Sequence, residues 1–274
     1  MGMTITEKIL AAHAGRKTVV PGEFIMARAP KTPEEVFADF SNDLKKDFGD
    51  DLISIILFGS GATGEYVPGK SDLNFLVVLA DDSAQSLHRA MDTVARWRKR
   101  MVNTPLFMTP EYISSSLDSY PIEFLDMKAN YRLVYGEDVL GDLSFQLAEV
   151  RVQCERELKG KLLHLRRAYL ESEGKAKNLR EIIAASITTF ISIFQGLLYL
   201  KSVPIPRTRE EIVQQVAAEF HMNAPVLLRL LAIRKGGVKV SARELSELFR
   251  NYVDEIEALS DSVDTLILTQ EEDV

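Results

Sequence analysis

Two short apolar runs bracket a glycine-containing segment, and this arrangement constrains the fold more than any other feature of the chain. The runs are Leu52–Phe58 and Leu73–Leu79, whose length and composition are typical of buried strands. Gly59 and Ser60 follow the first run directly, and Asp72 comes just before the second. Glycines and a proline in the intervening segment allow the chain to turn back. We therefore expect the two strand ends to lie close together.

The residues at these strand ends point to phosphate chemistry. Gly59 lets the backbone turn sharply and approach a ligand, and the Ser60 hydroxyl can donate a hydrogen bond to a phosphate oxygen. Asp72 and Asn74 are two residues apart, so on a strand their side chains share one face. The sequence predicts that a phosphate donor and an oxygen ligand for a metal ion converge here.

The order of strand, Gly59-Ser60, glycine-bearing loop and Ser71-Asp72-Leu73-Asn74 resembles the nucleotidyltransferase superfamily, which includes DNA polymerase beta and the aminoglycoside nucleotidyltransferases. The resemblance extends from about residue 32 to about residue 140 and implies a polymerase-beta-like domain with a small mixed sheet. It also implies that Gly59, Ser60, Lys70 and Ser71 bind the nucleotide. Lysines in glycine-rich loops are more often simply solvated, so a solvent-exposed Lys70 is the alternative.

The same resemblance implies a catalytic and metal-binding set of Asp72, Asn74 and Glu123. In such enzymes, carboxylates hold two magnesium ions that neutralise the triphosphate of ATP or another nucleoside triphosphate and activate the attacking hydroxyl. Asp126 is the rival of Glu123 for the third position. If the segment 121–127 is a strand, these two acids face opposite ways and only one of them can face Asp72. The resemblance favours Glu123.

Asn74 departs from the family pattern, which has a second acid at this position. An amide oxygen can coordinate magnesium but carries no charge, and hard cations depend on ligand charge. We therefore expect weaker metal binding and an impaired two-metal arrangement. Nucleotide binding remains compatible with this change.

The elements around the motif indicate an α+β domain over residues 31–141, preceded by an N-terminal extension over residues 1–30. Thr32, Pro33 and Glu35 form a capping-box pattern that predicts a helix start. Helical periodicity predicts another helix over Ala84–Arg100. The segments 105–110 and 121–127 are predicted as further strands. Mixed strands and helices in this order are typical of α/β or α+β domains.

Residues 142–274 have the pattern of an all-α domain. The apolar positions of residues 149–171 repeat with helical spacing, which predicts an amphipathic helix. Asn178, Thr208 and Ser241 each precede a glutamate by three residues, which is typical of helix N-caps. Prolines and glycines separate the helical segments, so we expect a bundle of about five helices. Such a bundle suits an acceptor-binding or interaction domain.

One helix in this region, Ile182–Leu200, is almost long and apolar enough to span a membrane. Several serines and threonines together with Gln195 and Gly196 dilute its apolar character. We expect a buried helix of the bundle and no membrane partner.

Composition narrows the class of protein. The net charge of −7 disfavours a general nucleic-acid binder. The basic run Arg96–Arg100 suits the C-terminal end of a helix, where the helix dipole favours cations. Cys154 is the single cysteine, which excludes an intrachain disulfide framework and is typical of cytoplasmic proteins. We expect a cytoplasmic protein.

The N-terminal extension carries a second, unrelated resemblance. The sequence MTITEKILAAHAGRK followed by VVPGE is similar to the start of the large subunit of isopropylmalate dehydratases. That dehydration requires an iron–sulfur cluster held by three cysteine thiolates, and the chain has one cysteine. The extension therefore does not predict dehydratase activity.

The sequence thus predicts a nucleotidyltransferase that moves a nucleotide monophosphate, AMP from ATP in the first instance, to a hydroxyl of a small molecule or a protein. The alternative is a catalytically degenerate module that still binds nucleotide or pairs with a partner, including a second copy of itself. Asn74 is the reason for keeping that alternative. A protein-modifying regulator of the antitoxin type differs from the first reading only in its acceptor.

Overall fold

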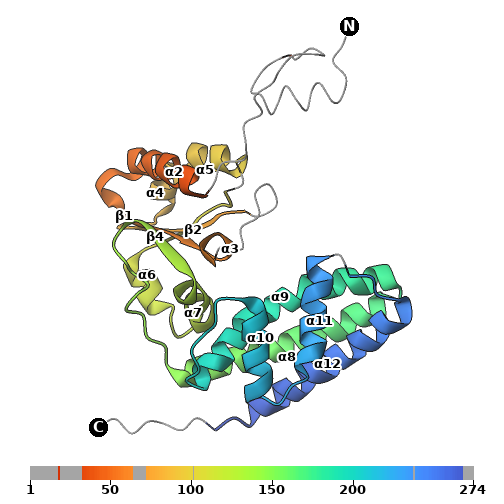
Figure 1. The fold of residues 1–274 in the computed structure, drawn as a ribbon. Helices are drawn as coiled ribbons and strands as arrows, with labels where there is room; N and C mark the ends of the chain where they lie inside the picture. Colours follow the sequence, from red (N-terminus) through yellow and green to blue (C-terminus); the bar gives the residue numbers. More distant parts are fainter. Residues whose placement is uncertain (1–17, 19–32, 64–71, 101, 237, 268–274) are drawn as a thin grey trace.

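A computed structural model describes residues 18, 33–63, 72–100, 102–236 and 238–267. These residues form a small sheet with helices on both faces, followed by a region of long packed helices (Figure 1). This order of elements confirms the predicted α+β fold with a helical C-terminal region. Thr32, Lys70 and Ser71 lie outside the described residues.

The sheet has four strands in the order β3-β2-β1-β4. Strand β1 pairs antiparallel with both β2 and β4, whereas β2 and β3 are parallel. The bounds of the strands are β1 Leu52–Phe58, β2 Asn74–Leu79, β3 Leu106–Met108 and β4 Tyr131–Gly136. The predicted adjacency of the first two apolar runs is confirmed, with Phe58 opposite Asn74.

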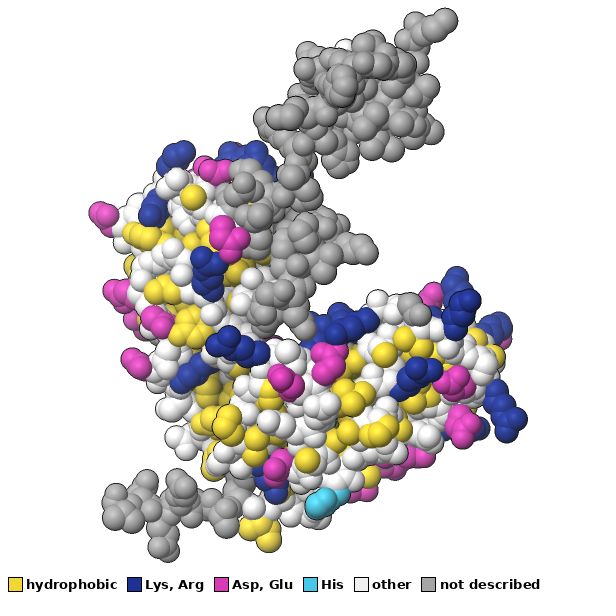
Figure 2. All heavy atoms as spheres, in the orientation of Figure 1, with side chains coloured by type: hydrophobic (Ala, Val, Ile, Leu, Met, Phe, Trp, Pro, Cys, Tyr) yellow, Lys and Arg dark blue, Asp and Glu magenta, His cyan; other side chains and the backbone are white. Residues whose placement is uncertain are grey.

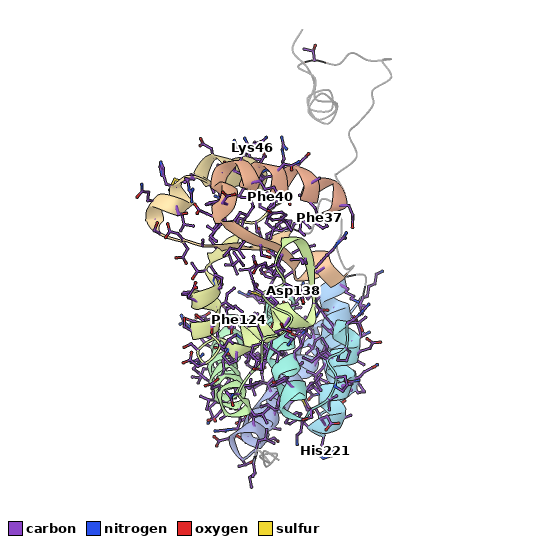
Figure 3. The ribbon with its side chains drawn as sticks, turned by 90° about the vertical axis from the view of Figure 1, so that its left-hand side faces the viewer. Phe37, Phe40, Lys46, Phe124, Asp138 and His221 are labelled. Atoms are coloured by element: carbon purple, nitrogen blue, oxygen red, sulfur yellow. The ribbon has the colours of Figure 1, made fainter. Side chains whose placement is uncertain are left out.

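One face of the sheet is covered by three helices, and aromatic residues fill the space beneath them. The helices are α2 Pro33–Phe48, α4 Ala84–His88 and α5 Met91–Arg98. The Phe40 ring lies 4.6 Å from the Phe75 ring and 5.5 Å from the Trp97 ring, between ring centroids. Figure 3 shows Phe37 and Phe40 of α2 together above the sheet.

The other face of the sheet packs on helices α6 Pro110–Ser115 and α7 Pro121–Ala129. Ile56, Leu76 and Val78 point to this side, where they join one continuous apolar core with the C-terminal helices. Because this core crosses the predicted boundary at residue 141, burial ties the sheet to the helical region. Helix α3, Ser60–Thr63, and the start of β2 lie at the end of the sheet next to this junction (Figure 1).

Among the described residues, the C-terminal region contains five helices, namely α8 Leu147–Glu171, α9 Ala176–Leu200, α10 Arg209–Glu219, α11 Ala224–Lys235 and α12 Ala242–Asp264. Helix α9 contacts all four of the others and also α7. By length and composition it is the one described helix that could cross a membrane, and 56% of its most apolar window is buried inside the structure. Its apolar character is therefore largely used in the core.

Several local predictions are confirmed. The amphipathic helix over residues 149–171 is α8. Thr208 forms a complete capping box with Glu211, and the Ser241 hydroxyl accepts a hydrogen bond from the Glu244 backbone. The third predicted cap is wrong, because α9 begins two residues before Asn178 and the Asn178 amide instead donates to the Ser172 carbonyl oxygen.

The prediction of a strand over residues 121–127 is wrong, because this segment is helix α7. Its alternating polar and apolar residues suggested a strand, but Pro121, Ile122, Phe124, Leu125 and Met127 are all buried. A helix packed between the sheet and α8 and α9 buries more than one face, which removes the helical periodicity from the sequence. Tertiary packing decided the conformation here.

The fourth strand of the sheet is β4, which the sequence analysis did not predict. It is an edge strand with mostly exposed or half-buried side chains, so it lacks a clear apolar face. The helix predicted over residues 84–100 is also divided into α4 and α5 by a short break after His88.

Candidate functional site

The turn after β1 has the shape that its glycine predicts. Gly59 has a φ of 71°, in the left-handed region where side chains are strained. Its carbonyl oxygen accepts a hydrogen bond from the Ala62 backbone, which closes the short helix α3, Ser60–Thr63. A Cβ atom added at Gly59 would lie 3.4 Å from Asn74 Nδ2. The turn therefore sits directly beside the first residue of β2.

The start of β2 presents one exposed carboxylate and one amide. Asp72 is exposed, and Asn74 is half-buried. The Asn74 Oδ1 atom accepts a hydrogen bond from Asn103 Nδ2 at 2.7 Å. The amide oxygen that would coordinate a metal ion is thus already engaged. The sequence analysis did not anticipate Asn103.

The described residues do not fit a two-magnesium centre. Among the described residues, no three acidic, histidine or cysteine side chains are grouped as a metal site requires. The strand beside β2 is β3, whose residues Leu106, Phe107 and Met108 carry no acid. Glu123 lies on helix α7 and not on a strand next to β2. A site built from Asp72, Asn74 and Glu123 remains a prediction that this geometry does not favour.

Glu123 has a structural environment of its own. It is exposed, and its Oε2 atom accepts a hydrogen bond from Gln153 Nε2 at 2.6 Å. The buried Gln153 also accepts a hydrogen bond from the Ile122 backbone at 2.8 Å. Gln153 therefore ties the first turn of α7 to α8, and Glu123 takes part in that connection.

Asp126 faces the glycine turn. It lines a cavity of about 110 Å³ together with Gly59 and Ser60, and the cavity is closed by polar residues of α9, including Ser192 and Gln195. Glu123 and Asp126 would point in opposite directions on a strand. On helix α7, residues three apart lie on the same side. The junction of sheet and helices brings the rival acid, Asp126, to the predicted phosphate-binding residues.

The surroundings of Asp126 favour its protonated form. Burial raises the pKa of this carboxyl above its ordinary value, and the negative charge of Glu123 adds to the effect. Hydrogen bonds from Ser192 and Gln195 and the charge of Arg209 oppose that shift without cancelling it. The Ser192 hydroxyl donates to Asp126 Oδ2 at 3.0 Å. A half-buried acid with a raised pKa is a stronger base than an ordinary aspartate and is suited to accept a proton.

Gln195 carries the one buried side-chain atom of this cavity that lacks a partner within the described part of the chain. The residue is 2% exposed, and its amide group hydrogen-bonds the Asp126 carboxyl. Among the described residues, no group donates a hydrogen bond to its Oε1 atom. A buried acceptor without a donor is costly, so this atom indicates a place for a ligand donor group.

Two arginines bring positive charge to the same cavity. Arg207 is exposed and Arg209 is half-buried, and both line the space that contains Gly59 and Ser60. Figure 2 shows Lys and Arg side chains beside the junction of the sheet with the helical region. Such charge favours phosphate at the cavity mouth.

A comparison with protein families supports the resemblance at domain level. The model of the family described as "Nucleotidyltransferase domain" matches residues 38–129, about a third of the chain. These residues are therefore similar to a nucleotidyltransferase domain. The matched residues include α2 from residue 38 onward, the glycine turn, the first three strands and all of α7.

Among solved structures, the chain is similar to spectinomycin adenyltransferase AAD(9) from Enterococcus faecialis, crystallised with ATP and spectinomycin. The two are 15% identical, with a TM-score of 0.49, and the match covers 80% of this chain and 99% of the other.

The N-terminal resemblance is also found by comparison. A stretch of 28 residues is 75% identical to the 3-isopropylmalate dehydratase large subunits of Heliobacterium modesticaldum and Aquifex aeolicus. The match spans 10% of this chain but only 7% and 6% of those relatives. This short similarity covers too little of the dehydratase subunits to assign their activity to this chain.

The site residues that sequence reasoning missed lie on the helical side. Ser192 and Gln195 were visible as polar residues within an apolar helix, three positions apart and therefore on one face. Arg207 lies two residues before α10, and Arg209 is the first residue of that helix. Their convergence on Asp126 depends on how α7, α9 and α10 pack, which a single sequence does not reveal.

Proposed function

We propose that the protein binds a nucleoside triphosphate, preferentially ATP, at the Gly59–Ser60 turn and transfers its nucleotidyl group to a hydroxyl acceptor. The observation that carries this proposal is the single cavity that unites Gly59 and Ser60 with Asp126 and Arg209. A phosphate-binding turn, a proton acceptor and a positive charge at one place can each serve nucleotidyl transfer.

The proposed reaction assigns a role to each side of the cavity. The acceptor hydroxyl oxygen attacks the α-phosphorus, the bond from that phosphorus to the oxygen bridging the β-phosphate breaks, and pyrophosphate leaves. Asp126 takes the proton of the attacking hydroxyl, for which its raised pKa suits it. Arg207 and Arg209 offset the negative charge on the phosphates. Because the acidic residues in the described part of the chain do not fit a two-metal centre, no step of this proposal passes through a metal ion.

The acceptor side of the proposal rests on Gln195. Its Oε1 atom lacks a donor, and the Asp126 carboxyl lies within hydrogen-bonding reach of the same side chain. An acceptor hydroxyl placed between them would donate to one of these oxygens before it reacts. The acceptor class is therefore a small molecule or protein side chain with an accessible hydroxyl.

Incubation with ATP labelled on the α-phosphate tests the proposal. Candidate acceptors are small polyhydroxylated compounds and total soluble protein, and transfer is read by retention of label on the acceptor. We expect labelled product from the wild-type protein and little from Asp126→Asn. A folded sample that binds ATP but labels no acceptor would contradict transfer.

The second candidate function is nucleotide binding without transfer. The environment of Asn74 Oδ1 favours it, because an uncharged oxygen that already accepts a hydrogen bond from Asn103 at 2.7 Å is a weaker metal ligand than a carboxylate. The Asn74→Asp variant separates the two candidates. Transfer that rises with magnesium in this variant indicates a weakened enzyme, and no transfer in either protein indicates a binding module.

A further inference from the structure

A hydrogen bond from Asn103 sets the orientation of the Asn74 side-chain amide. Its oxygen accepts the hydrogen bond from Asn103 Nδ2 at 2.7 Å, so its nitrogen must point away from Asn103. That nitrogen lies over Gly59, where an added Cβ would be 3.4 Å from it. The side chain therefore presents an N–H donor, and not an oxygen ligand, to the glycine turn.

The cavity beside Asn74 and Asn103 has the character of an anion-binding site. It has a volume of about 400 Å³ and is lined by Asn74, Asn103, Thr104 and Arg98 together with apolar residues. No described lining residue is acidic. A magnesium ion depends on negatively charged ligands, whereas a phosphate depends on N–H donors and cations. The lining matches the second requirement.

The cavity on the other side of the turn has compatible charge. Arg207 and Arg209 line it together with Gly59, Ser60 and Asp126, so that two cations face one acid among the described lining residues. A phosphate group at the turn would thus meet amide nitrogen on one side and guanidinium groups on the other. Where a carboxylate needs an intervening cation to hold a phosphate oxygen, an amide can donate to that oxygen directly.

We propose that Asn74 donates a hydrogen bond directly to a phosphate oxygen of the bound nucleotide, so that the triphosphate binds without a bridging magnesium ion. This inference rests on the proposed function, in which nucleotide phosphates occupy the Gly59–Ser60 turn. The substitution of an acid by Asn74 then changes the mode of phosphate recognition and does not merely weaken a metal site.

Calorimetric titration of the full chain with ATP, in EDTA and in excess magnesium, tests the inference. For the wild-type protein we expect dissociation constants that agree within about twofold in the two buffers. For Asn74→Asp we expect binding at least about tenfold weaker in EDTA, because the new carboxylate repels phosphate, and recovery when magnesium is added. Thermal unfolding of each variant confirms that it is folded.

Asn103→Ala is the matched control. It frees the Asn74 amide to rotate, so we expect weaker ATP binding in both buffers but no new dependence on magnesium. Wild-type binding that is at least about tenfold tighter in magnesium than in EDTA would overturn the inference while leaving the proposed function intact. Absence of ATP binding in both buffers would overturn both.

Discussion

The two sides of the candidate site differ in charge and in burial. The strand side consists of Asp72, Asn74 and Asn103, where one carboxylate is exposed and the amides bond to each other. The helix side consists of Asp126, Ser192 and Gln195, where an acid with a raised pKa is held by hydrogen bonds. The strand side carries the sequence motif, but the helix side holds the acid whose pKa is shifted.

Under the proposed function, this difference separates nucleotide binding from nucleotidyl transfer. The strand side keeps the turn geometry that lets a phosphate approach, and Gly59 retains the positive φ that this requires. The helix side holds the group suited to accept a proton. A change on one side should therefore alter mainly nucleotide binding, and a change on the other mainly transfer.

The largest effect expected is loss of transfer when Asp126 is changed. Asp126→Asn removes the proposed proton acceptor, and we expect the turnover rate of labelled transfer to fall by about 10²- to 10⁴-fold while ATP binding is retained. Glu123→Gln, three residues earlier on the same helix, is the matched control and should change the rate by less than about threefold. Equal losses in both variants would remove the distinction between the two acids.

The packing of α9 against α8 should be sensitive to a single methyl group. A Cβ atom added at Gly196 would lie 2.8 Å from Cys154 Sγ, in the buried contact of these helices. We expect Gly196→Ala to lower the free energy of unfolding by about 1–3 kcal/mol in chemical denaturation. Gly160→Ala is the matched control on α8, where an added Cβ meets nothing within 4 Å. It should leave stability unchanged or raise it by up to about 1 kcal/mol.

A smaller effect is expected from Gln195. Gln195→Leu keeps the volume of the side chain but removes the oxygen proposed to receive the acceptor hydroxyl. We expect the KM for the acceptor to rise about tenfold while the KM for ATP changes by less than about twofold. A rise in the KM for ATP alone would assign Gln195 to the nucleotide and contradict its place on the acceptor side.

The pH dependence of transfer gives the smallest effect. Asp126 must be ionised to accept a proton, so transfer should be lost as pH falls through its raised pKa and be retained above it. Gln195→Leu removes a hydrogen bond that lowers the pKa of Asp126, so the acidic limb of the rate profile should move to higher pH. An acidic limb that stays in place would show that another group limits the rate.

The strand side could be predicted from the sequence because its elements are local. Two continuous apolar runs identified β1 and β2, and the register places Phe58 opposite Asn74 as their spacing suggests. Gly59 is adjacent to the strand end, so its role needed no information from distant parts of the chain.

The helix side could not be predicted in the same way. Helix α7 is buried on several sides and has no helical stripe, so its sequence resembled a strand. That error placed Glu123 and Asp126 on opposite faces of a strand. On a helix, residues three apart lie on the same side. The meeting of Asp126 with Ser192 joins residues 66 positions apart, a contact set by tertiary packing.

Amide hydrogen exchange measured with and without ATP tests directly where the nucleotide binds. With ATP in EDTA, we expect slower exchange in peptides that contain Gly59–Thr63 and Asp126–Asn130, because both line the cavity at the sheet–helix junction. Inorganic pyrophosphate should protect the first peptide more than the second. Unchanged exchange in both peptides, at ATP concentrations that saturate binding, would contradict the proposed site.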